Sequence, residues 1–323
     1  MSSTKPVMTK VERVLAALRG APVDRTPISF WYHFHLEDRP PAVFADAELE
    51  FYRKYDVDWL KVMHDYPFGA PEMLGSVKSS SDWRSLRPVV PRSGGFAKQT
   101  EALRRIAAGL AGEATFVDTV FSPWATAQKL CGRVGLEHLR TDPASLREGL
   151  RIVAESLAGY VPVALEAGAS GIYLAVDGAT SDVMGADEYA DLVRPFDLEV
   201  LAAAKSAPFN VLHIHGQNIY FQELKDYPVH GISWSAGITR PTIAEARATY
   251  PGCLITGIDE TRVAAMGVPE IQAQVHQAIR DAGGRGIVVA SGCAVPTDTP
   301  EEHLRAARAA VESSRIDLGL RVL

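Results

Sequence analysis

The sequence has few cysteines, and their positions argue against a disulfide scaffold. Cys131, Cys253 and Cys293 are an odd number and lie far apart in a chain of 323 residues. Disulfide-stapled domains have denser, even-numbered cysteine patterns. Each of the three is therefore expected to be either a small buried side chain or a metal ligand.

Long hydrophobic runs and blocks of one charge are also lacking. The apolar stretches are no longer than a strand, as at 286–290, and residues 1–10 are polar without a hydrophobic signal core. The formal net charge is −6, and the charged residues, 22% of the chain, form no long run of one sign. These features predict a cytoplasmic protein with no nucleic-acid partner and no membrane partner.

Short β-branched runs alternate with amphipathic segments along the whole chain. This alternation is typical of repeated β-α units around a parallel sheet, and 47% apolar residues suffice for a large core. Strands are predicted at 28–32, 59–63, 115–121, 171–174, 209–213, 231–233, 254–257 and 286–290. Helical segments between them include 144–167, 186–206, 243–249 and 269–282. We predict an α/β fold in which residues 1–323 form a single (β/α)8 TIM-type barrel domain.

Helix caps and loop lengths agree with this barrel. Asp142, which precedes a proline, is a good N-cap, and Gly168 and Gly283 stand where helices should end. The longest connections, 33–42 and 66–95, follow the first two strands. In a barrel such loops lie at the C-terminal ends of the strands, where active sites are built.

Two histidines at the end of the fifth predicted strand give the sharpest local signal. His213 and His215 are two residues apart, so their side chains share one face of the strand and point toward the barrel mouth. Two imidazoles on one face are half of a metal site. The same pair would also suit a site without metal, in which both histidines bind a substrate carboxylate or phosphate.

A cysteine after the eighth predicted strand falls at the same end of the barrel. Cys293 follows Ser291-Gly292, and the chain then turns into the last helix. Together with His213 and His215 it would offer two nitrogens and one sulfur, a ligand set that suits zinc with a position left for substrate or water.

Several blocks carry a family resemblance over the full chain. They are VERVLAALRG at 11–20 with VDRTP at 23–27, FSPWATA at 121–127, EAGASGIYL at 166–174 leading to Asp177, and ITGID at 255–259. In this order they resemble the uroporphyrinogen decarboxylase-like superfamily, which implies a (β/α)8 barrel. In its methylcobalamin-dependent methyltransferase branch a His-x-Cys pair and a distant cysteine hold zinc. His213 and Cys293 match two of these positions, and His215 stands at the place of the first cysteine.

This branch implies a zinc-dependent methyltransferase that moves a methyl group between a corrinoid and a small acceptor such as a thiol. In the family, zinc binds the acceptor thiol and lowers its pKa. The resemblance implies zinc held by His213, His215 and Cys293, and methylcobalamin as methyl carrier. The carrier could sit on a separate corrinoid protein, and a homodimer is compatible with the resemblance.

Decarboxylation of a porphyrinogen fits the sequence less well. The family's segment after the first strand carries arginine for the substrate carboxylates, whereas this chain has FWYHFH at 30–35. Arginine matches a carboxylate with two parallel donors, which neither His33 nor His35 supplies. Arg25 and Arg39 flank this segment but lie outside the motif.

The same rim suggests a second function. Several histidines with aromatic neighbours would suit a metal-dependent lyase or decarboxylase acting on a small carboxylated or aromatic substrate. A non-catalytic binding protein on the same fold is a third alternative. The residues expected in catalysis are His33, His64, Asp65 and Asp177, and those expected to contact substrate are Tyr32, His35, Trp124, Tyr173 and Asn218. For the aromatic residues, core packing is the competing interpretation.

Overall fold

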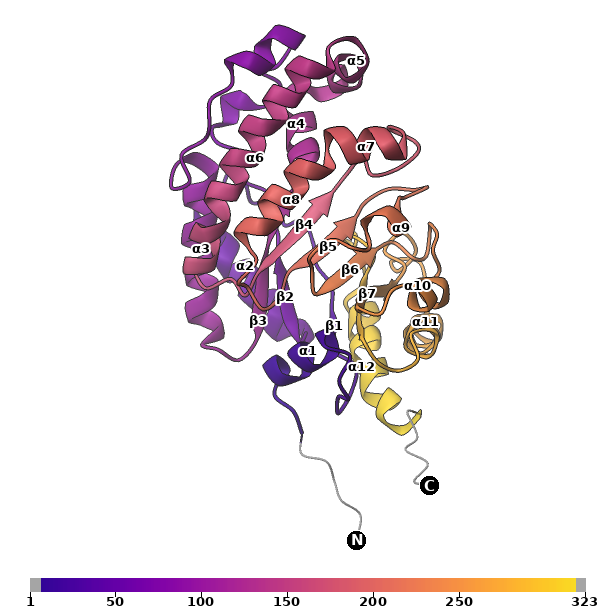
Figure 1. The fold of residues 1–323 in the computed structure, drawn as a ribbon. Coiled ribbons are helices and arrows are strands. Elements are labelled where there is room, and N and C mark those ends of the chain that lie inside the picture. Colours follow the sequence, from indigo (N-terminus) through magenta and orange to yellow (C-terminus); the bar gives the residue numbers. More distant parts are fainter. Residues whose placement is uncertain (1–6, 318–323) are drawn as a thin grey trace.

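Eight parallel strands form one sheet that curls into a barrel (Figure 1). The computed structural model describes residues 7–317. The strands are β1 (Ile28–Ser29), β2 (Trp59–Val62), β3 (Thr115–Phe121), β4 (Ile172–Val176), β5 (Val211–Ile214), β6 (Gly231–Trp234), β7 (Cys253–Ile258) and β8 (Ile287–Ser291). Hydrogen-bonded neighbours run in the order β1-β8-β7-β6-β5-β4-β3-β2. The predicted (β/α)8 fold is confirmed.

Helices follow the strands and cover the outside of the barrel (Figure 1). They are α1 (Lys10–Leu18), α2 (Pro41–Tyr55), α3 (Gly94–Leu110), α4 (Pro123–Cys131), α5 (Gly135–Thr141), α6 (Pro143–Glu166), α7 (Ala186–Leu192), α8 (Arg194–Ala203), α9 (Phe221–Leu224), α10 (Ile243–Thr249), α11 (Val268–Asp281) and α12 (Glu301–Asp317). Short 3-10 turns are η1 (Pro71–Met73), η2 (Ser80–Ser85) and η3 (Gly132–Val134). α1 packs against β2, β3 and β8 and covers the N-terminal end of the barrel. Among the described residues, no helix combines the length and the apolar character that crossing a membrane requires.

The barrel closes between β1 and β2 through a few specific contacts. Asp58 N donates to Ile28 O at 2.9 Å, and Ile28 N donates back to the Asp58 carboxylate at 2.9 Å. Ser29 Oγ donates to Trp59 O at 2.8 Å. Side-chain oxygens therefore take the place of part of the backbone hydrogen bonds between β1 and β2. They keep the buried backbone groups of this β1–β2 seam paired.

Two predicted elements differ from the structure for identifiable reasons. The first strand ends at Ser29 rather than at residue 32, because β8 stops at Ser291 and only Val295 N continues the pairing, to Trp31 O. The predicted helix 186–206 is broken into α7 and α8. Pro195 lacks the N–H that would bond Asp191 O, and Arg147 donates to that carbonyl instead at 3.0 Å.

Most other boundaries agree with the prediction. The Asp142 carboxylate accepts from Ser145 N at 3.1 Å and caps α6, and Gly168 and Gly283 have positive φ just after α6 and α11. The helix predicted at 243–249 is α10 (Ile243–Thr249).

A column of aromatic rings fills the barrel beneath its C-terminal opening. Phe209 and Trp59 lie at the start of the column with ring centroids 5.0 Å apart. Trp59 contacts Trp31 at 6.1 Å, Trp31 contacts Tyr173 at 5.5 Å, and Tyr173 stacks on His213 at 5.4 Å. Each such pair is worth about 0.5–1.5 kcal/mol beyond the area it buries. The column gives His213 a rigid support.

Candidate metal centre and active-site cavity

A cavity of about 370 Å³ lies at the C-terminal end of the barrel. Its walls come from β2, β3, β4 and β5, from α4, and from the segments that follow β1 and β8. Inward-facing side chains alternate along each strand, so residues two apart face it together. This is the end of a (β/α)8 barrel at which active sites form.

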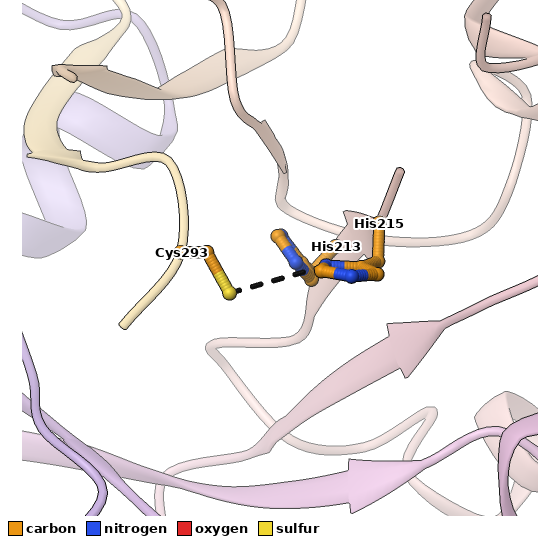
Figure 2. Close-up of side chains that lie close together, drawn as sticks. All are labelled: His213, His215 and Cys293. Atoms are coloured by element: carbon orange, nitrogen blue, oxygen red, sulfur yellow. Dashed lines mark hydrogen bonds between the residues drawn. The ribbon is translucent and has the colours of Figure 1, made fainter. Parts of the chain in front are cut away.

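His213, His215 and Cys293 come together in this cavity (Figure 2). One nitrogen of each histidine and the thiol sulfur all lie within 4.8 Å of one another. Cys293 Sγ lies 3.9 Å from His215 Nδ1, and the two imidazole centroids are 5.8 Å apart. The spacing of two on β5 and the turn after β8 therefore produce the convergence that the sequence predicted.

The three side chains perturb one another's protonation. Burial by itself raises the pKa of the Cys293 thiol, but hydrogen bonds to and charges on His213 and His215 outweigh it and lower this pKa to about 4. The bond to Cys293 raises the pKa of His215, whereas burial lowers the pKa of His213. In the metal-free protein Cys293 is therefore a thiolate hydrogen-bonded to the imidazoles, and the thiolate is the form of cysteine that binds metal.

The loop that carries Cys293 packs closely on the neighbouring strand ends. A Cβ on Gly292 would lie 2.5 Å from Ser235 Cα and 2.6 Å from Glu260 Oε2. Ser235 Oγ donates to Glu260 Oε1 at 2.5 Å, and burial raises the pKa of Glu260. Glycine is therefore required for the approach that brings Cys293 to the histidines.

Other predicted residues line the same cavity. Tyr173 stacks on His213, and its hydroxyl donates to Ser233 Oγ at 2.9 Å. His33, which follows β1, also lines the cavity, and its Nδ1 is 2.8 Å from Oδ1 of Asp65, a predicted residue that is not itself part of the lining. Burial raises the pKa of Asp65, but the hydrogen bond to His33 and the charges of His33, Lys61 and His64 together outweigh it, so the net shift of this pKa is downward.

Asp177 also faces the cavity, and its carboxylate is held in place by a hydrogen bond to Gln128. In the amide orientation that satisfies both neighbours, Gln128 Nε2 donates to Asp177 Oδ2 at 2.8 Å and Gln128 Oε1 accepts from Trp124 Nε1 at 3.1 Å. Gly178, with φ +83, lies against the Trp124 ring, where a Cβ would be 2.5 Å from Nε1. Trp124 thus supports Asp177 and is not itself part of the lining.

The remaining predicted residues lie elsewhere. His64 is buried against Phe96 and Tyr160 and lines a second cavity of about 540 Å³, and burial lowers its pKa to about 4. His35 is exposed and stacks on His33. The other two do not line the cavity, since Tyr32 packs on Phe51 of α2 and bonds the Tyr55 hydroxyl, and Asn218 donates to Asp182.

Sequence reasoning missed two lysines of the cavity, Lys61 and Lys129. Lys61 lies in the middle of β2, and the spacing of two places Trp59 and Met63 on the same inward face as Lys61. The sequence signal for Lys61 is a single charged residue in an otherwise apolar strand, at a position whose side chain faces the barrel interior. Lys129 comes from α4 and lies over the Phe121 ring, 3.2 Å from its centroid. Burial lowers the pKa of each lysine to about 8.

The donor set fits a zinc ion. Zinc–nitrogen bonds of about 2.0–2.1 Å and zinc–sulfur bonds of about 2.3 Å require ligand atoms a few ångströms apart, as the three are here. Ser233 Oγ lies 3.4 Å from His213 Nδ1, a contact that orients the ring and leaves its other nitrogen for a metal. Three protein ligands facing a cavity are typical of catalytic sites with a position for substrate.

Comparison with known proteins gives a consistent set of relatives. A family model described as uroporphyrinogen decarboxylase (URO-D) matches residues 62–314. The uroporphyrinogen decarboxylase of Synechococcus sp. (strain JA-3-3Ab) is 24% identical, over 91% of this chain and 90% of that protein. A methyltransferase from Methanosarcina mazei superimposes with a TM-score of 0.81 at 20% identity, covering 95% of this chain and 99% of that one. A putative vitamin-B12 independent methionine synthase from Listeria monocytogenes gives a TM-score of 0.59 at 12% identity, covering 91% and 98%. The two structural likenesses bear on the fold alone.

Proposed function

Because the chain belongs to the uroporphyrinogen decarboxylase (URO-D) family, we propose that it is a zinc-dependent methyltransferase that moves a methyl group between a corrinoid and a small acceptor such as a thiol. The observation that carries this proposal is the convergence of His213, His215 and Cys293 on the cavity. The family and the fold shared with a methyltransferase support an enzyme of the methyltransferase or decarboxylase type.

Each residue of the cavity has a part in this proposal. Zinc bound by His213, His215 and Cys293 would act as a Lewis acid that lowers the pKa of a bound thiol. Asp177, fixed by Gln128 and facing the cavity, would accept the proton that the thiol loses. The Tyr173 ring holds His213 in place.

The size of the cavity separates the roles of acceptor and donor. A volume of about 370 Å³ suits a small molecule and is too small to enclose a corrin ring. The methyl carrier, methylcobalamin or a separate corrinoid protein, would therefore approach the mouth from outside. A porphyrinogen would not fit inside either, in line with the histidines that replace arginine after the first strand.

A metal-dependent lyase or decarboxylase acting on a small carboxylated molecule is the second candidate. Two observations favour it, namely the small volume of the cavity and the decarboxylase activity named for the curated relatives. Such an enzyme would use the same zinc ligands but would need no methyl donor.

Metal content and methyl transfer test the proposal together. Protein purified without chelator should contain about one zinc per chain by elemental analysis, and His213→Ala and Cys293→Ala should each lose it. His230→Ala and Cys131→Ala are matched controls, because both residues lie outside the cavity lining, and they should keep the zinc. Methylcobalamin and a thiol would then be added, and the cobalamin spectrum would report demethylation.

Two results would count against the proposal. Full zinc occupancy in both His213→Ala and Cys293→Ala would place the metal elsewhere. Zinc-loaded protein that binds thiols but never demethylates methylcobalamin would favour the lyase.

A further inference from the structure

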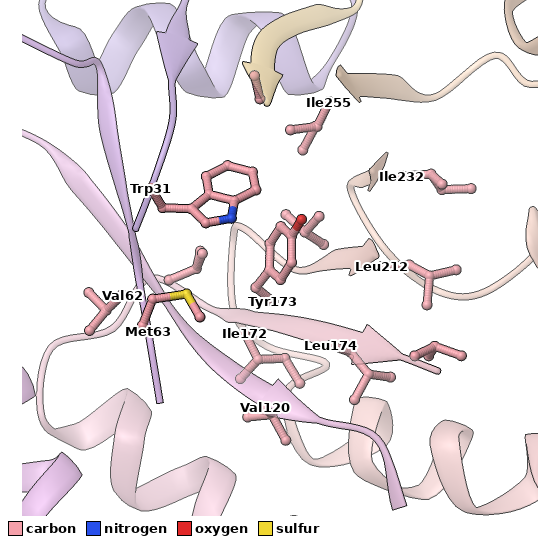
Figure 3. Packing of buried hydrophobic residues seen from close by; sticks show 14 of the residues in the cluster. Trp31, Val62, Met63, Val120, Ile172, Tyr173, Leu174, Leu212, Ile232 and Ile255 are labelled. Carbon is pink, nitrogen blue, oxygen red and sulfur yellow. The ribbon is translucent and has the colours of Figure 1, made fainter. Parts of the chain in front are cut away.

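Lys61 is a buried ammonium group without a carboxylate partner. Its side chain belongs to a residue that is only 4% exposed, and it lines the same cavity as Cys293. The Nζ atom donates to Met63 Sδ and lies 5.4 Å from the centroid of the Trp31 ring and 4.9 Å from that of the Tyr173 ring. Figure 3 shows these three neighbours, Trp31, Met63 and Tyr173, among the buried side chains of the barrel. In the part of the chain that the structure describes, no carboxylate forms a salt bridge with it.

The charges that act on Lys61 are those of the Cys293 thiolate, which is hydrogen-bonded to His213 and His215, and of three carboxylates that have other partners. Asp118 accepts from Tyr160 and Gln99, at 2.7 and 2.8 Å, and Asp65 bonds His33. Glu48 accepts from a backbone N–H at 3.1 Å, and burial raises its pKa to about 8, so it is largely uncharged at neutral pH. None of them is in place to neutralise the ammonium group directly.

Removing a charged amine from water without a partner costs several kcal/mol in proteins. Thioether and aromatic contacts recover only part of this cost, since the attraction of an ammonium group to an aromatic ring is weaker than its attraction to an anion. An anion delivered from outside would recover more, because charge-assisted hydrogen bonds are strong where water is excluded. The cavity gives such an anion direct access to the lysine.

We propose that Lys61 binds a carboxylate group of the substrate, in the same cavity as the His213–His215–Cys293 centre. The substrate class is then a small molecule with one carboxylate at one end and the reacting group at the other. Lys61 stands amid the apolar side chains of Trp31, Met63 and Tyr173 and matches one negative charge next to an apolar part of the substrate, whereas the second lysine of the cavity, Lys129, lies over Phe121. Lys61 is a specificity-determining residue in this arrangement.

This inference rests on the proposed function only for the identity of the reacting group. If that group is a thiol, the substrate is a mercaptocarboxylate. If the reaction is instead a lyase reaction, the same lysine holds a carboxylate of that substrate.

The test compares two probes that differ mainly in charge, 3-mercaptopropionate and the neutral 3-mercapto-1-propanol. Their dissociation constants are measured by calorimetry with wild-type protein, Lys61→Met and the control Lys205→Met, which changes an exposed lysine outside the cavity. Methionine keeps the length and apolar stem of Lys61 and removes only the charge. Each protein is used zinc-loaded and metal-free.

The wild type and Lys205→Met should bind the acid more tightly than the alcohol. Lys61→Met should bind the acid about 10- to 100-fold more weakly, the usual effect of a lost hydrogen bond to a charged group, and bind the alcohol within about twofold of the wild type. Equal weakening of both probes in Lys61→Met would assign the lysine a purely structural role and overturn the proposal. A wild type without preference for the acid would overturn it as well, whether or not the variant folds.

The metal-free measurements separate this inference from the proposed function. A Lys61-dependent preference for the acid that persists without zinc, in a protein that transfers no methyl group, would support the carboxylate subsite while the methyltransferase proposal fails. Methyl transfer by a protein whose preference for the acid does not depend on Lys61 would overturn the carboxylate subsite and support the methyltransferase.

Discussion

The three cysteines show how environment decides the chemistry of one residue type. Burial raises the pKa of Cys131, and it raises the pKa of Cys253 to about 12. Cys293 differs because His213 and His215 lower its pKa to about 4. Only Cys293 is therefore a thiolate at neutral pH, and the two others are inert packing residues.

This difference predicts the pH dependence of alkylation in metal-free protein. The thiolate of Cys293 is present above its folded pKa and is lost only as the pH falls through about 4. Its rate with iodoacetamide should therefore be nearly constant from pH 5 to 8, as followed by mass spectrometry of its peptide. An ordinary thiol, with a pKa of about 8.5, gains roughly tenfold per pH unit over this range.

The double variant His213→Ala/His215→Ala and Cys131 in the same sample are the controls for alkylation. Without the imidazoles, the Cys293 rate should rise with pH, because burial alone raises the pKa of a thiol. Cys131 should react slowly and with the same rising profile. A steep increase for Cys293 in the wild type would contradict the thiolate.

Single residues of the site were predictable where strand periodicity governs them. His213, His215 and Tyr173 alternate on strands, and their common orientation follows from a period of two. Loop residues were not predictable in this way. Asn218 has a left-handed backbone, with φ 48, and its side chain bonds Asp182, so its direction depends on local turns rather than on the sheet.

At the scale of elements, strand order and most helices could be read from the sequence, whereas their ends depend on partners. The first strand is short because β8 stops pairing with it after Ser29. The break between α7 and α8 had a visible signal in Pro195. No local pattern shows how closely the loop after β8 approaches β6 and β7, since that packing forms only in the closed barrel.

Gly292 tests the packing of that loop. In Gly292→Ala the new methyl group would lie 2.5 Å from Ser235 Cα, so the loop must shift and carry Cys293 away from the histidines. We expect zinc affinity to fall about 10- to 100-fold, the usual effect of changes just outside a metal's ligands. Chelator competition measures this. Gly185→Ala is the control, because a Cβ there meets nothing within 4 Å, and zinc affinity should not change. Unchanged affinity in Gly292→Ala would mean that the loop adapts without moving the thiol.

At the scale of the whole molecule, the two ends of the barrel hold different kinds of polar cluster. The C-terminal end holds the candidate metal centre formed by His213, His215 and Cys293. The N-terminal end holds Asp58, which is fully buried and bonds both Arg13 Nη1 at 2.7 Å and Arg25 Nη1 at 2.6 Å. Arg13 also bonds Asp24 Oδ1 at 2.7 Å. The first family motifs, at 11–20 and 23–27, thus supply the ion pairs that secure the β1–β2 seam rather than residues of the site.

This separation predicts that stability and metal binding can be altered independently. Asp58→Ala leaves two buried arginines without their shared carboxylate, a loss that costs about 3–5 kcal/mol. Urea unfolding of metal-free protein should show a free energy of unfolding lower by that amount, with zinc affinity of the folded protein within about twofold. Cys293→Ala should do the reverse, losing zinc while the free energy of unfolding changes by about 1 kcal/mol or less, as expected for a partly exposed rim residue.

A surface ion pair provides the control for Asp58→Ala. Asp191 pairs with Arg147 but its side chain is 85% exposed, so Asp191→Ala should change the free energy of unfolding by less than about 1 kcal/mol. If Asp58→Ala weakened zinc binding as strongly as Gly292→Ala does, the ion pairs at the β1–β2 seam would also determine the geometry of the zinc ligands at the barrel mouth. The independence of the two ends would then fail. If only the free energy of unfolding fell, the ion pairs at the N-terminal end would stabilise the closed barrel without affecting the site. The residues at the C-terminal end could then change without loss of the fold.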